Sequence, residues 1–132
     1  MKQRVRKIER ILKVQEHLQR EAELRLSKLE RESQEIRNAQ EVLIHTMNDH
    51  ETLHGLFVDV AAKRLQVLSA QASRVDTAKT AQKAVTFDRA MQAKRTEKML
   101  SGLKEDERQQ TEKKDLVAIL ESLAGRGGTS FP

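Results

Sequence analysis

The amino-acid sequence predicts an all-α protein: a long antiparallel two-helix coiled-coil hairpin, followed by a short amphipathic C-terminal helical segment and a disordered tail. Charged residues make up 34% of the chain and aromatic residues 2%, a composition typical of long helices rather than of a compact globular core. The single proline, Pro132, comes last, so no earlier residue forces a helix to break. We therefore expect one helical domain over residues 1–124 and a tail over 125–132.

The first helix is predicted over about residues 4–47, from a row of positions seven residues apart that is apolar except at one place. A sustained seven-residue repeat indicates a coiled coil. The row is Ile8, Gln15, Ala22, Leu29, Ile36 and Leu43. Gln15 is its polar member, and either fixes the register of the pairing or lies at a frayed end of the seam.

A turn is predicted within residues 48–58. The stretch from Asn38 to Ala62 contains no Lys and no Arg, although 25 of the 132 residues are basic. Asn48 and Asp49 are good helix-capping residues, and Gly55 relaxes the backbone. This stretch is therefore the expected reversal point between two charged helices.

The second helix is predicted over about residues 59–100, which makes it nearly as long as the first. Its apolar positions, spaced alternately by four and three, are Ala61, Leu65, Leu68, Ala72 and Val75. Near residues 81–85 this row changes phase, and it continues as Ala84, Phe87, Met91, Met99 and Leu103. Such a slip alters supercoiling locally. Gly102 is the expected break.

The segment 103–124 is predicted to hold a polar extension and then a short amphipathic helix. Its apolar residues are Leu116, Ile119, Leu120 and Leu123. Gly125 is a natural helix stop, and the glycine-rich residues after it are typical of a disordered tail. The apolar face either packs back on the hairpin or stays available to a partner.

Residues 50–54 read His-Glu-Thr-Leu-His and match the His-x-x-x-His spacing of zinc hydrolases. A catalytic zinc site also needs a third protein ligand and a shaped cavity. No histidine follows His54, and a thin hairpin has no cleft. We therefore expect no metal, no cofactor and no small-molecule substrate, and we expect that the protein is not an enzyme.

The charge pattern bears on partners and location. The chain has no cysteine, no apolar run long enough to span a membrane, and a basic start without an apolar segment after it, so we expect a cytoplasmic protein. Residues 63–98 carry nine basic and three acidic side chains. A positive helix suits nucleic acid, acidic lipid or an acidic protein groove, and is also typical of a merely solvated face.

Two helices bury only one seam each, which provides little tertiary stabilisation. Such a chain typically oligomerises or enters a larger assembly, so an interaction module is the physical expectation. One alternative is a homo-oligomeric coiled-coil scaffold. Another is a basic nucleic-acid-binding coiled coil, although the chain lacks aromatic residues for stacking and any groove-reading motif.

The chain resembles the FliJ/YscO family of type III export proteins over its whole length. The resemblance rests on an amphipathic, basic opening and the Glu-Ala-Glu-Leu run that follows at residues 21–24. The opening is Val5-Arg6-Lys7-Ile8-Glu9-Arg10-Ile11-Leu12-Lys13-Val14-Gln15-Glu16. Chain length, hairpin form and the absence of cysteine also agree with this family.

The resemblance implies a flagellar or type III export stalk that inserts into the ring of the export ATPase, contacts the export gate, and handles export chaperones. It would be cytoplasmic and peripheral to the inner membrane through these partners. The ring-docking residues would be Arg4, Arg6, Lys7, Arg10, Lys13, Lys94, Arg95 and Lys98, with the apolar face at 116–123. The gate contact would correspond to Gln40, Ile44 and Met47, although the tyrosines of the family's patch are missing here.

Overall fold

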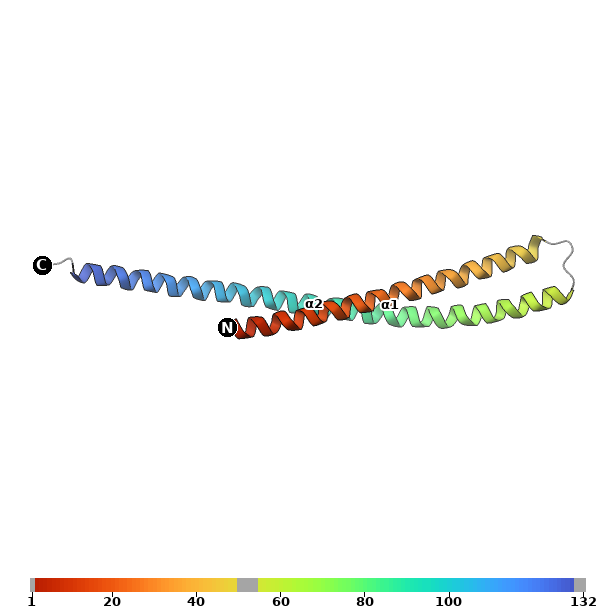
Figure 1. Cartoon of the computed structure of the whole chain (residues 1–132), viewed down its shortest axis with the longest axis horizontal. Coiled ribbons are helices and arrows are strands. Elements are labelled where there is room, and N and C mark those ends of the chain that lie inside the picture. The colour runs from red at the N-terminus through yellow and green to blue at the C-terminus, as the bar shows by residue number, and fades with distance from the viewer. Residues whose placement is uncertain (1, 50–54, 130–132) are drawn as a thin grey trace. The chain divides into compact units, whose positions relative to one another are not determined.

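The chain consists of two long helices in close contact (Figure 1). The computed structural model describes residues 2–49 and 55–129, with their side chains over 2–48 and 57–126. Helix α1 covers Lys2–Asp49 and helix α2 covers Gly55–Thr129. The prediction of an all-α protein with two long helices is confirmed.

Both helices extend further than the sequence predicts. Helix α1 exceeds the predicted range 4–47 by two residues at each end. Helix α2 begins at Gly55 rather than at residue 59, so Gly55 is the first residue of a helix instead of part of the turn. Residues 50–54 of the predicted turn lie outside the described residues.

The predicted break at Gly102 and the predicted helix stop at Gly125 are both wrong, because α2 continues through them to Thr129. A glycine typically ends a helix by adopting a positive φ, and no glycine in the described part of the chain does so. A helical glycine otherwise costs only about 1 kcal/mol. Leu100, which is buried, and Leu103, which is half-buried, anchor the helix beside Gly102.

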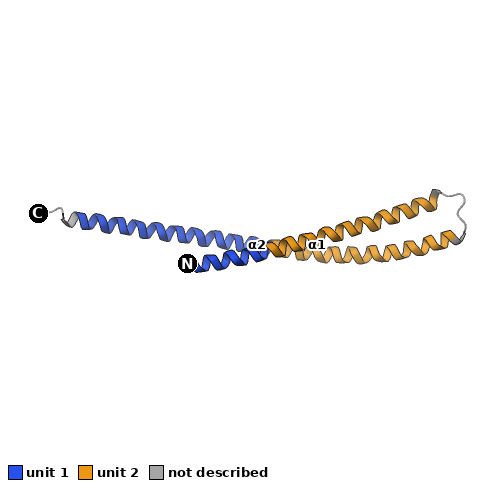
Figure 2. Cartoon of the chain, in the orientation of Figure 1, with its two compact units in different colours: residues 1–16, 91–132 blue, residues 17–90 orange. Residues whose placement is uncertain are grey.

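The chain divides into two compact units, and α1 and α2 contribute to both (Figure 2). Unit 2 contains residues 17–90. Its core is the buried cluster of Ile36, Leu68 and Val75, packed against partly buried Leu29, Leu43 and Ala72. These are residues of the predicted apolar rows, so the sequence pattern located this core.

Two hydrogen bonds show how the helices of unit 2 are aligned. The Ser33 hydroxyl donates to Asp76 Oδ1 at 3.4 Å, and the Gln40 side-chain amide donates to Ser69 Oγ at 3.4 Å. Gln40 follows Ser33 by seven residues, and Ser69 precedes Asp76 by seven. Later residues of α1 therefore lie beside earlier residues of α2.

Helix α2 also approaches the backbone of α1 at Ala22. The Ala22 carbonyl accepts hydrogen bonds from Gln82 Nε2 at 3.1 Å and from Thr86 Oγ1 at 3.3 Å. Thr86 Oγ1 is also 2.8 Å from the carbonyl of Gln82 in its own helix. The small side chain of Ala22 permits this close approach, and Ala22 is only 5% exposed as a result.

The predicted change of phase in the second helix is wrong. Ala84 is exposed, and Phe87 and Met99 are 64% and 53% exposed. Of the other two predicted members, Met91 and Leu103 are half-buried, and Leu103 belongs to the unchanged row. The contact row instead keeps its spacing of three and four through Gln82, Thr86, Ala93, Thr96 and Leu100, which are half-buried or buried. A search for apolar residues misses this row, because polar side chains occupy several of its positions.

Unit 1 contains residues 1–16 and 91–132. Val5 on α1 and Ala93 and Leu100 on α2 are buried, and Glu9 Oε1 lies 3.4 Å from Lys104 Nζ. From residue 108 to residue 126, every side chain of α2 is exposed. Neither helix, over the residues described, has an apolar stretch that could cross a membrane.

Candidate interaction surface

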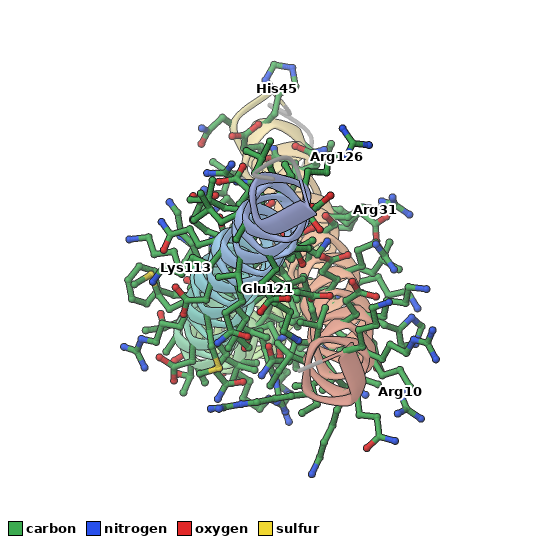
Figure 3. All side chains as sticks on the ribbon, turned by 90° about the vertical axis from the view of Figure 1, so that its left-hand side faces the viewer. Arg10, Arg31, His45, Lys113, Glu121 and Arg126 are labelled. Carbon is green, nitrogen blue, oxygen red and sulfur yellow. The ribbon has the colours of Figure 1, made fainter. Side chains whose placement is uncertain are left out.

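The eight basic residues predicted to dock in a ring all belong to unit 1. All are exposed, and none of their side chains forms an ion pair or a hydrogen bond within the described ranges. Figure 3 shows Arg10 pointing outward from α1. They are Arg4, Arg6, Lys7, Arg10 and Lys13 on α1, and Lys94, Arg95 and Lys98 on α2. Unit 1 therefore presents uncompensated positive charge from both helices.

The two basic groups follow one another along unit 1. The ion pair between Glu9 and Lys104 shows how the two helices are aligned in unit 1, and a groove is lined by Lys2 and Gln3 on α1 and by residues of the segment 107–114 on α2. The first turns of α1 therefore lie beside a mixed-charge part of α2, after the segment 94–98. The sequence identified both groups, but not this offset.

Arg108 neutralises part of that mixed-charge segment. It donates to Glu105 at 2.6 Å and forms a short contact with Glu112. The hydrogen bond from Arg108 lowers the pKa of Glu105, and Arg108 in turn has a raised pKa, chiefly through the hydrogen bond to Glu105. These charges balance one another within α2, so the segment adds little net positive charge.

The predicted apolar face at 116–123 lies on the exposed end of α2. Leu116, Ile119, Leu120 and Leu123 are 56–57% exposed, and Val117, which sequence reasoning omitted, is 52% exposed. The contact row of α2, continued at its spacing of three and four, passes through Lys114, Val117 and Glu121. The apolar face therefore looks to a different side from the row that contacts α1, and it remains available to a partner.

The three residues predicted to contact the export gate have different surroundings. Gln40 is half-buried and bonded to Ser69, and Met47 is also half-buried. Ile44 is 47% exposed. Ile44 is thus the most accessible of the three.

The His-x-x-x-His motif at 50–54 lies outside the described residues, so its lack of a metal stays a prediction. Within the residues that the structure describes, no three His, Cys, Asp or Glu side chains are grouped as they would be around a metal ion.

An apolar groove on unit 2 was not anticipated from the sequence. Val42 has 65% of its surface exposed there. The sequence gives little indication of this groove, because Val42 directly precedes Leu43 of the contact row and its own exposure is not evident from residue type. The groove has a volume of about 390 Å³ and is lined by Asn38, Ala39, Val42, Leu43, Thr46, Arg64 and Leu68.

Comparison of the chain with protein-family models, with curated proteins and with solved structures finds no match.

Proposed function

We propose that the protein is a non-enzymatic stalk of a flagellar or type III export apparatus, which docks in the ring of the export ATPase through unit 1. One observation carries the proposal: eight exposed basic side chains from two helices gather in a single unit without described acidic partners. The resemblance of the basic opening, Val5 to Glu16, to the FliJ/YscO family supports the same assignment.

The proposal includes an antiparallel coiled-coil hairpin as the rod of the stalk. It is supported by the opposite seven-residue steps of the Ser33–Asp76 and Gln40–Ser69 hydrogen bonds. It is also supported by buried or half-buried positions spaced by three and four on both helices. Spin labels at Leu18 and Ala90 test it: we expect short intramolecular distances at all protein concentrations. Long distances, or short ones only between chains, contradict the hairpin.

The basic residues have a definite physical task in this proposal. Exposed cations form ion pairs that are individually weak and readily rearranged, which suits a surface that must adapt to a ring. Together they speed the encounter with an acidic partner and make binding sensitive to salt. The exposed apolar face at 116–123 lies in the same unit, and it would supply apolar contact in the ring or to an export chaperone.

Charge reversal provides the experiment. Changing Arg6, Arg10 and Lys98 to Glu should reduce stimulation of an export-type ATPase and weaken ring assembly, without changing the helix content. The matched control changes three exposed basic residues of unit 2, Lys28, Arg31 and Lys63, to Glu. It therefore alters the net charge by the same amount as the unit 1 variant. Figure 3 shows Arg31 pointing outward.

We expect the unit 1 variant to lose stimulation at low salt and the unit 2 variant to keep it. Equal behaviour of the two variants, or a natural chain that never stimulates the ATPase, contradicts docking through unit 1. The homo-oligomeric scaffold would then be the better assignment. The proposed contact with the export gate rests on Ile44 and is tested separately, by the loss of gate binding in Ile44→Asp.

A further inference from the structure

One face of unit 2 combines apolar side chains with charged side chains that lack partners, among them Glu35 and Arg74. Val42 on α1 is 65% exposed and lines the apolar groove on this face. Val67 on α2 is 46% exposed, and it lies on the same side of its helix as Arg64 of the groove, which it follows by three residues. A second groove continues it and is lined on its α1 side by Glu35 and on its α2 side by Arg74. Neither the Glu35 carboxylate nor the Arg74 guanidinium forms an ion pair or a hydrogen bond within the described part of the chain.

The hydrogen bonds across unit 2 place these residues in two matched pairs. Glu35 lies two residues after Ser33, and Arg74 lies two residues before Asp76, so Glu35 and Arg74 are level. Val42 lies two residues after Gln40, and Val67 lies two residues before Ser69, so Val42 and Val67 are level as well. Each pair spans the width of the face, with one member on each helix.

We propose that a second copy of the chain packs on this face, parallel to the first, with α1 of each copy lying over α2 of the other. A two-fold axis along the helices produces this arrangement, and such an axis requires a self-complementary surface. Val42 then meets Val67 of the second copy, and Glu35 meets Arg74 of the second copy. The axis generates each contact twice.

The charges favour this direction of packing over its reverse. If α1 packs against α1, the acidic residues Glu32 and Glu35 of both copies lie together on one side, and both Arg74 side chains lie on the other. Like charges brought together oppose association. The parallel arrangement instead brings each carboxylate to an arginine, which has the planar donor geometry that suits it.

The inference goes beyond the proposed stalk and does not rest on it. The pairing surface belongs to unit 2, whereas the proposed docking residues belong to unit 1. Loss of self-association therefore leaves the ATPase proposal open, and loss of ATPase stimulation leaves the pairing open.

Sedimentation of the full chain over a range of concentrations tests the pairing. We expect a monomer–dimer equilibrium whose dissociation constant rises about tenfold or more in Val42→Lys. Leu24→Lys is the matched control, because Leu24 has the same exposed fraction of 65% and lines none of the grooves on this face. A monomer at all concentrations, or equal weakening by both variants, overturns the proposal.

Two further measurements test the arrangement. Glu35→Arg and Arg74→Glu should each weaken the dimer, and their combination should restore it, which a purely structural effect would not do. Because the chain has no cysteine, disulfides introduced by substitution are unambiguous. A mixture of Val42→Cys and Val67→Cys chains should cross-link. Cross-linking only of Val42→Cys chains with themselves would show the reverse packing and overturn the parallel one.

Discussion

Two apolar rows on α2 have the same helical spacing and opposite surroundings. In unit 2, Leu68 and Val75 are 4% and 8% exposed and pack with Ile36 of α1. In unit 1, Leu116, Leu120 and Leu123 are more than half exposed. The spacing dictates which side of a helix is apolar, but that side is covered only where it faces α1, and the row at 116–123 lies on a different side of α2 from the contact row. Helix α1 has 48 residues and α2 has 75, so part of α2 has no counterpart on α1.

Truncation of a leucine in each row should give the largest contrast. Leu68→Ala removes buried side-chain volume, and we expect the free energy of unfolding to fall by about 2–4 kcal/mol. Leu120→Ala removes the same atoms from an exposed position, and we expect a change within about 0.5 kcal/mol. Urea unfolding followed by circular dichroism measures both, and equal losses would mean that the row at 116–123 is covered in solution.

A polar residue of the contact row on α1, Gln15, provides a second test of how burial affects stability. Gln15 Oε1 is buried and accepts no hydrogen bond from the described residues. Because an unsatisfied buried acceptor is costly, we expect Gln15→Met to raise the free energy of unfolding by about 1 kcal/mol. Gln3→Met, at an exposed position of the same helix, should leave it nearly unchanged. A loss of stability in Gln15→Met would favour a register-fixing role for this side chain.

Gly102 lies in the paired part of α2, between buried Leu100 and half-buried Leu103, and its substitution should have the smallest effect. A Cβ added at Gly102 meets nothing within 4 Å, so Gly102→Ala should stabilise the protein by about 0.5–1 kcal/mol through helix propensity alone. Gly125→Ala also has open space, but it lies in the exposed part and should affect global unfolding less. Destabilisation by Gly102→Ala would indicate that the helix is interrupted there.

The sequence predicted the elements better than their ends. The seven-residue row through Ala22, Leu29 and Ile36 predicted the contact side of α1, because those positions are apolar and are buried or partly buried. The row through Gln82, Thr86 and Thr96 was missed, because its side chains bury methyl and methylene groups while remaining polar by type. The continuation through Gly102 was also missed, because a helix end depends on backbone conformation rather than on the presence of glycine.

The candidate interaction surface also has parts that the sequence predicted and parts that it did not. The basic residues of unit 1 were identified directly from the sequence, since charged residue types are usually exposed. The groove at Val42 was not, because an apolar residue beside the contact row is normally counted as part of it. The level pairing of Glu35 with Arg74 depends on the alignment of two helices, which residue types alone do not specify.

The polar contacts across unit 2 have a consequence for the uniqueness of the alignment. An apolar row that repeats every seven residues is nearly unchanged when one helix slides past the other by seven. The hydrogen-bonding residues do not repeat in this way. After a slide of seven residues in one direction, Ser33 would face Ser69 and Gln40 would face Ala62. After a slide in the other direction, Ser33 would face Lys83 and Gln40 would face Asp76. Polar contacts that stabilise the protein only weakly therefore distinguish one alignment from its neighbours, and they keep the face that carries Val42 and Val67 in a single arrangement.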